Sequence, residues 1–271
     1  MTASYYGRPI LKRPVWKWLI PAYFFTGGLA AGSSLLALGA RLTGRPRLAR
    51  RARLTSLGAI TASAAFLIED LGRPARFANM LRVVRPTSPM SVGSWVLAVY
   101  GPAVGHAAVR RHGSVPAEVT AALLAPVVAT YTGVLVADTA VPAWQRARRE
   151  LPLLFASGAA ASAGGLALAL APADESGPAR RLALAGAVGE LATAEAMKRR
   201  LGEVASVYEH GKARAFSVLS RRLTATGAVV AALGGRRLGG ALLVGGAAAE
   251  RFAVFHAGVQ STDDPRFVTG S

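Results

Sequence analysis

The sequence predicts an all-α integral membrane protein with eight transmembrane helices, arranged as two four-helix bundles. Of its 271 residues, 52% are hydrophobic and only 17% are charged, whereas about 25% of residues are charged in typical soluble domains. The charges stand in short blocks, and long apolar runs lie between the blocks. A run of about 20 apolar residues is what a helix needs to cross a bilayer, so repeated runs indicate a chain that crosses several times.

Each apolar run is assigned to one span. The predicted spans are residues 18–40, 54–71, 91–110, 117–137, 151–171, 180–197, 217–234 and 238–258. The seventh holds Arg221 and Arg222, whose side chains must reach toward the interface. The eighth holds Glu250 and Arg251, which we therefore expect to face protein or a polar cavity rather than lipid.

The expected organisation follows from this count. Residues 1–140 form the first four-helix bundle, residues 141–259 the second, and residues 260–271 a polar C-terminal tail. With eight spans, both termini and the longer connections lie on one side. That side holds more Lys and Arg in total, so the positive-inside rule places it in the cytoplasm, with the chain in the plasma (inner) membrane.

Composition also excludes several classes of protein. The net charge of +18 would suggest nucleic-acid binding in a soluble protein, but here the arginines flank apolar spans, as in "RLTGRPRLARRAR" at 41–53. With no cysteine, the chain forms no disulfide and binds no iron–sulfur cluster of its own. The first apolar run is too long for a secretory signal peptide and is interpreted as a retained helix.

Motifs for common enzyme chemistry are missing from the sequence. It has no P-loop, no dinucleotide-binding glycine motif, no HExxH and no GxSxG. Two histidines on different helices could bind a haem, but His106 and His256 are expected at opposite membrane faces. We therefore expect no haem.

Acidic and phenolic side chains gather at one predicted membrane face. Glu69 and Asp70 end the second span, Asp138 ends the fourth, and Tyr131 lies about two turns deeper on the fourth. Tyr23, at the start of the first span, belongs to the same face. Charge near the membrane interior is costly, so such residues suggest function, although capping of helix ends or pairing with Arg73, Arg76 or Arg146 stays an open alternative.

Phenols beside acids at the mouth of a helix bundle suit a quinone. A quinone ring is flat and apolar, and its carbonyls need hydrogen-bond donors, which a tyrosine hydroxyl supplies without burying charge. A carboxylate nearby can deliver the proton that accompanies each electron.

Two further patterns concern packing. Small residues recur at four-residue spacing, in Gly28 with Gly32 and in Gly101 with Gly105, which predicts close helix contacts. Trp144 could anchor an interface or belong to an aromatic belt at the membrane surface, and the belt is the favoured interpretation.

Three stretches resemble the NrfD family, the membrane subunits of polysulfide reductase and related molybdenum-enzyme complexes. They are "WKWLIPAYFFTGGLAAGS", "LIEDLGRPARFANMLRVVRPTSPMSVGSW" and "YTGVLVADTAVPAWQ". The resemblance covers mainly residues 5–150 and implies a quinone-binding subunit. It also implies a four-cluster ferredoxin-like iron–sulfur partner and, beyond it, a molybdopterin catalytic subunit.

The resemblance also implies roles for particular residues. Tyr23 and Tyr131 fall at the quinone-contacting positions, although the polysulfide-reductase member has histidine where Tyr23 stands. Another polar position of that site falls at Ile20, which removes one contact. Arg73 and Arg76 are expected to orient the loop after the second span and to help dock the partner.

We therefore expect electron exchange between a quinone, with menaquinone favoured, and the iron–sulfur partner. Tyr23 and Tyr131 would bind the quinone, and Glu69, Asp70 and Asp138 would relay protons. On its own the chain would not be a complete enzyme. Two alternatives stay open: a structural anchor without quinone chemistry, and a secondary transporter.

Overall fold

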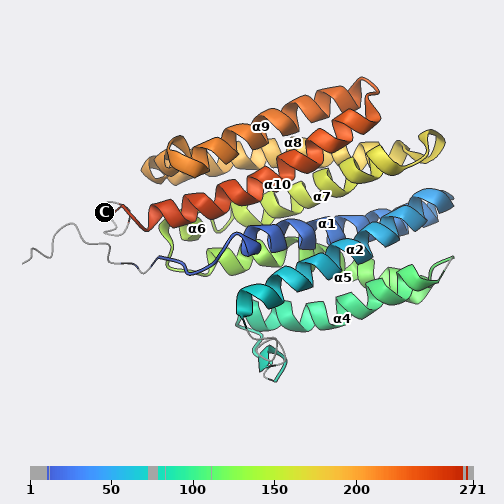
Figure 1. Cartoon of the computed structure of the whole chain (residues 1–271), viewed down its shortest axis with the longest axis horizontal. Helices are drawn as coiled ribbons and strands as arrows, with labels where there is room; N and C mark the ends of the chain where they lie inside the picture. The colour runs from blue at the N-terminus through green and yellow to red at the C-terminus, as the bar shows by residue number, and fades with distance from the viewer. Residues whose placement is uncertain are drawn as a thin grey trace, which may run out of the picture.

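The computed structural model describes residues 11, 13–72, 79–82, 84–110, 112–264 and 267. In this part of the chain the structure is helical and contains no strand, which confirms the all-α prediction (Figure 1). The helices are α1 (Leu19–Leu42), α2 (Pro46–Leu71), α4 (Pro89–Val109), α5 (Val115–Ala137), α6 (Pro142–Arg146), α7 (Glu150–Leu170), α8 (Gly177–Leu201), α9 (Gly211–Ala232) and α10 (Arg236–Ser261), with 3₁₀ segments η1 (Ala173–Glu175) and η2 (Gly202–Glu209).

Every predicted span coincides with a long helix, and the largest difference is at the start of α2. That helix begins at Pro46, eight residues before the predicted span, and includes the arginine-rich segment 47–53. Arginine favours helix, and proline is well tolerated in the first turn, so the helix extends beyond its apolar part.

Among the described residues, six helices are long and apolar enough to cross a membrane: α1, α2, α4, α5, α7 and α10. At 1.5 Å per residue, helices of this length extend over roughly 30–40 Å. The eight-span count is therefore not confirmed, because α8 and α9 are not among the six. Both are long enough, but α8 carries Glu190 and Glu195, and α9 carries Arg221 and Arg222, inside their lengths.

The long helices lie side by side along the long axis of the molecule (Figure 1). Contacts join α1, α2, α4 and α5 to one another in a ring, and another ring joins α7, α8, α9 and α10. However, α7 also packs on both α1 and α5, and α1 touches α10. The helices thus form one continuous body, and the division into two four-helix bundles stays a prediction.

The two ends of this body differ. At one end, here called the long-loop end, α1, α4, α7 and α9 begin, and α6 and η2 lie between helices. At the other, the short-loop end, the connections are only a few residues long. The start of α1 and the end of α10 lie at the long-loop end (Figure 1).

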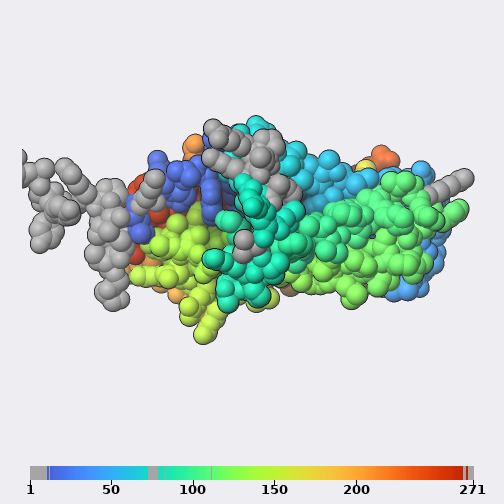
Figure 2. Space-filling view, turned by 90° about the horizontal axis from the view of Figure 1, so that it is seen from below, coloured from blue at the N-terminus to red at the C-terminus, as the bar shows by residue number. Residues whose placement is uncertain are grey.

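Helix α1 is the most enclosed of the candidate spans. In its most apolar window 83% of residues are buried inside the protein, against 22% in α2 and 28% in α4. Figure 2 shows α2 and α4 forming much of the outer surface on one side of the molecule. The face of α1 that meets α7 carries small residues, which allow the two backbones to approach closely.

The predicted glycine contacts hold for one pair only. A Cβ built on Gly32 would lie 2.5 Å from the Ala159 oxygen of α7, and one on Gly28 would lie 3.3 Å from the Ala159 methyl. Gly101 and Gly105, on α4, meet nothing within 4 Å in the described part of the chain. The packing prediction is therefore right for α1 and wrong for α4.

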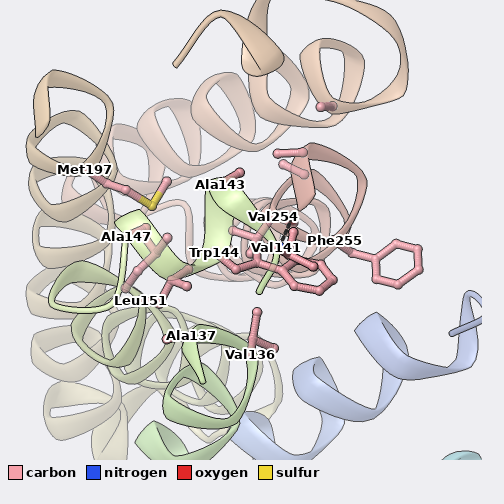
Figure 3. Packing of buried hydrophobic residues seen from close by; sticks show 14 of the residues in the cluster. Val136, Ala137, Val141, Ala143, Trp144, Ala147, Leu151, Met197, Val254 and Phe255 are labelled. Atoms are coloured by element: carbon pink, nitrogen blue, oxygen red, sulfur yellow. Dashed lines mark hydrogen bonds between the residues drawn. The ribbon is translucent and has the colours of Figure 1, made fainter. Parts of the chain in front are cut away.

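Trp144 lies in the core at the long-loop end, not in an interfacial belt (Figure 3). Its side chain is 1% exposed, and its Nε1 donates a hydrogen bond to the Val254 oxygen at 2.8 Å. The indole stacks on Trp16, with ring centroids 5.5 Å apart. Gly258 lies so close beneath the indole that no Cβ fits there. The belt interpretation was wrong because α6 packs against α10, which buries the Trp144 side chain.

Glu250 and Arg251 are buried, as the sequence predicted. Arg251 donates to a Glu250 carboxylate oxygen and, at 2.6 Å, to the Phe155 carbonyl oxygen of α7. Its guanidinium also lies over the Phe155 ring, 4.0 Å from the centroid. Nearby, Glu190 accepts a hydrogen bond from the Thr224 hydroxyl at 2.9 Å. These pairs keep charge inside the protein and away from lipid.

Candidate functional site at the long-loop end

A small cavity opens at the long-loop end between α1, α2, α4 and α5, with a volume of about 100 Å³. Its walls are mainly apolar. The lining residues are Trp16, Ile20, Tyr23, Phe24, Leu67, Asp70, Leu71, Met80, Met90, Ser94, Leu97, Tyr131 and Leu135. Of the five residues predicted to bind the quinone or relay its protons, Tyr23, Asp70 and Tyr131 therefore share one cavity.

Tyr131 comes from the second half of α5 and is 8% exposed. Its ring lies against Gly93 of α4: a Cβ at Gly93 would lie 2.6 Å from Tyr131 Cδ2. Its hydroxyl is buried and makes no hydrogen bond within the described part of the chain. A buried hydroxyl without a partner is costly, so this Oη is available to a bound molecule.

Tyr23 comes from the first turns of α1 and is 4% exposed. Its ring lies 5.6 Å from that of Phe24, which in turn lies 5.7 Å from the Phe155 ring of α7. The Tyr23 carbonyl accepts a hydrogen bond from the Ser63 hydroxyl of α2 at 3.2 Å. Contacts with both α2 and α7 thus hold this part of α1 at the cavity.

Asp70 lies in the last turn of α2. The helix ends at once, because Gly72 adopts a left-handed conformation with φ 71°. One Asp70 carboxylate oxygen accepts a hydrogen bond from the Lys17 backbone N–H at 3.4 Å. This bond ties the segment before α1 to the end of α2 and holds the carboxylate at the edge of the cavity.

The other predicted acids are placed differently. Glu69 and Asp138 are exposed, and neither lines the cavity. Asp138 is the C-cap residue of α5, and its backbone N–H donates to the Val134 oxygen. Arg73 and Arg76 lie outside the described residues, so their docking role stays a prediction.

Several cavity residues escaped the sequence reasoning. Ile20 was identified only as the position of a lost contact, and it does line the cavity. Trp16, Met90 and Ser94 lie within the stretches that carry the family resemblance but were given no role. A signal was present for Met90 and Ser94: four-residue spacing at the start of α4 puts both on one face.

Within the described residues, no group of three or more His, Asp or Glu side chains could hold a metal ion. His106 lies in the last turn of α4, at the short-loop end. His256 lies near the other end and stacks on Phe216, with centroids 5.5 Å apart. The two histidines thus stand at opposite ends, where the sequence placed them.

The arrangement suits a flat apolar molecule that accepts hydrogen bonds. Two phenols face apolar walls, and a carboxylate stands at the rim. The volume is well below the roughly 300–1,000 Å³ of ligand pockets, so the cavity holds at most part of a ring. Met80 and Met90 line it, and flexible methionine side chains readily make room.

Comparison with known proteins bears on the first part of the chain. No curated protein matches the sequence. A family model matches residues 10–110. This range includes the helices α1, α2 and α4, which supply most of the cavity lining. The apolar helices indicate an integral membrane protein. The matched family is described as "Polysulphide reductase, NrfD", which confirms the predicted resemblance for residues 10–110.

Proposed function

We propose that this chain is the quinone-reactive membrane subunit of an oxidoreductase complex. It would exchange electrons between a quinone in the membrane, menaquinone by preference, and an iron–sulfur partner subunit of a molybdopterin-type enzyme. The observation that carries the proposal is the buried Tyr131 hydroxyl, which has no hydrogen-bond partner among the described residues and shares a cavity with Tyr23 and Asp70.

The two tyrosines would bind and orient the ring. Each phenol can donate one hydrogen bond to a carbonyl oxygen without placing charge in an apolar wall. Tyr131 is anchored by its contact with Gly93, and Tyr23 by the packing of α1 on α2 and α7. Apolar side chains such as Ile20 and Leu97 would exclude water from the ring.

Asp70 would move protons. A bound quinone supplies two-electron chemistry, and its full reduction takes up two protons. One oxygen of Asp70 is occupied by the Lys17 N–H, and the carboxylate can hold a proton at the rim of the cavity. Glu69 and Asp138, both exposed at the same end, would exchange protons with water.

The partner would dock at the long-loop end, beside the cavity. The chain has no cysteine, so the iron–sulfur clusters and the molybdopterin must belong to other subunits. Arg73 and Arg76 remain the proposed docking residues. The proposed site of the complex is the plasma membrane, with the long-loop end in the cytoplasm.

The test is quinone turnover by the purified complex. Tyr23→Phe with Tyr131→Phe should lower the rate with a quinone analogue and reduce the amount of quinone that co-purifies. Asp70→Asn should lower the rate but leave the co-purified quinone in place, because it removes a proton carrier and not a ring contact.

Tyr100→Phe is the matched control. Tyr100 is also a buried tyrosine of the same helix group, but its hydroxyl lies 2.8 Å from the Ser34 hydroxyl and outside the cavity. It should leave turnover unchanged. If the double tyrosine variant reduces the analogue at the normal rate, the assignment of these residues is wrong. If, in addition, no quinone co-purifies with the wild-type complex, the result favours the alternative of a structural anchor without quinone chemistry.

A further inference from the structure

A second cavity lies at the short-loop end, far from the tyrosines, and it is strongly basic. It has a volume of about 460 Å³ and lies at the end of α1 and the start of α2. Its charged lining consists of Arg41, Arg45, Arg47, Arg50, Arg53 and His112. The proposed quinone chemistry uses none of these residues.

Three of the five arginines are held by carboxylates. Glu118 of α5, only 2% exposed, accepts hydrogen bonds from Arg41 Nε at 2.7 Å and from Arg53 Nη1 at 2.9 Å. Arg47 pairs with Asp174 and, at 2.8 Å, with Glu175. The cavity is lined by the end of α1, the start of α2 and His112, and the carboxylates of α5 and η1 hold three of its arginine side chains in place.

The remaining two arginines carry the excess charge. Within the described residues, Arg45 and Arg50 form no ion pair, and the Arg45 side chain donates only to the Thr43 carbonyl oxygen, at 3.1 Å. Five arginines against Glu118, Asp174 and Glu175 leave a net charge of about +2 at the cavity. A guanidinium donates in a planar fork that fits two oxygens of a phosphate.

An apolar face continues from Arg50 along α2 toward the middle of the molecule. Leu54, one turn on, is 48% exposed, and Gly58, another turn on, meets nothing within 4 Å in the described part. Thr61 and Ala65 extend the same exposed row. Residues at three- or four-residue spacing share one helix face, so a shallow, mainly apolar path leads away from the basic cavity.

We propose that this cavity binds the phosphate of an anionic phospholipid, with an acyl chain lying along Leu54 and Gly58 of α2. The location supports this occupant, because membrane-crossing helices end here and lipid headgroups lie at that level. A free phosphate would use the arginines but not the apolar row. An acidic partner segment would equally leave that row unused.

The experiment uses the full-length chain, purified in detergent and stripped of lipid. Phosphatidylglycerol, phosphatidylcholine and inorganic phosphate are titrated separately, and the rise in the unfolding temperature is followed. Phosphatidylglycerol should stabilise the protein at low concentration, whereas phosphatidylcholine and inorganic phosphate should not. Removing Arg45 and Arg50 as R45Q/R50Q should weaken phosphatidylglycerol binding roughly 30-fold, at about one factor of five for each arginine.

The matched control is R181Q/R237Q, which removes two exposed arginines near the same end but outside the cavity. It should bind phosphatidylglycerol like the wild type. If the control weakens binding as much as R45Q/R50Q does, the effect is general surface charge and the proposal is wrong. An equal response to inorganic phosphate would also overturn it, because the site would then hold a free anion.

A measurement on the wild type guards against a variant that fails to fold. A photoreactive phosphatidylglycerol, labelled in its acyl chain, should crosslink to the α2 segment 54–61. Crosslinks confined to other helices would contradict the proposed position of the chain.

Discussion

Gly93 of α4 and Tyr131 of α5 fit together as a pair: the ring of Tyr131 occupies the space that a side chain at position 93 would need. A Cβ there would lie 2.6 Å from Tyr131 Cδ2 and closer still to Cε2. The position of the phenol therefore depends on a residue with no side chain, on a different helix.

Gly93→Ala should displace Tyr131 and lower quinone turnover. Overpacking of this kind typically costs about 1–3 kcal/mol, so the variant should also unfold more readily in detergent. Gly101→Ala, on the same helix, is the control, because a Cβ built on Gly101 meets no atom of another element within 4 Å among the described residues. Alanine favours helix over glycine, so the control should be neutral or slightly stabilising. If both variants lose the same turnover and stability, the contact between Gly93 and Tyr131 is not the cause.

Arg251→Leu should destabilise the protein strongly. The change leaves Glu250 buried without its cation and removes the donor to the Phe155 carbonyl, and breaking a buried pair in this way costs about 3–5 kcal/mol. Denaturant unfolding in detergent measures the loss. Arg222→Leu, at an exposed position of α9, should change stability by less than about 0.5 kcal/mol. A small effect at Arg251 would mean that water reaches the pair.

Trp144→Phe should weaken the junction between α6 and α10. It removes the hydrogen bond to the Val254 oxygen and reduces stacking on Trp16, with an expected cost of about 1–3 kcal/mol. Trp18→Phe makes the same exchange at a residue that is 60% exposed, so it should lower the free energy of unfolding far less. If both changes behave alike, Trp144 is not buried as described.

Glu175 should make stability depend on pH at the short-loop end. Burial opposes its ionisation, but hydrogen bonds from the Leu48 N–H, at 2.7 Å, and from Arg47, together with the Arg47 charge, outweigh burial and lower its pKa. A lowered pKa contributes stability at pH values above the ordinary pKa of about 4.3, and that contribution is lost as pH falls through the folded-state pKa.

Glu175→Gln should therefore unfold more readily than the wild type at pH 7, and the difference should shrink below about pH 4. Thermal unfolding from pH 3 to pH 7 measures it. Asp174→Asn is the control, because the Asp174 side chain is 65% exposed and exposed pairs contribute little. A difference between wild type and Glu175→Gln that persists unchanged at pH 3 would contradict the assigned role.

The sequence predicted the helices well because apolar runs determine where they lie. It placed the start of α2 too late, since arginines 47–53 ended the apolar run without ending the helix. It predicted α8 and α9 as spans, and that prediction is not confirmed, because charged residues within both helices keep them out of the six apolar candidates. Hydropathy records what a segment contains and not what packs against it.

Site residues were predictable only in part. Tyr23, Asp70 and Tyr131 came from topology and resemblance, and the structure groups them in one cavity. Gly93 gave no signal, because its importance arises from a ring on another helix. Glu118 was missed for the same reason: a single acid at a helix start resembles a favourable N-terminal residue until Arg41 and Arg53 are seen to converge on it.

The enclosure of α1 has a consequence for how the protein is made. Ribosomes release α1 before every other helix described, yet α1 ends up packed against α5, α7 and α10. Its contacts with these three helices can therefore form only after each of them has been synthesised. Its small residues, Gly28 and Gly32 among them, gain their contacts only when α7 arrives. Chains that stall before residue 170 would keep this face open, and membrane quality control would have a surface to recognise.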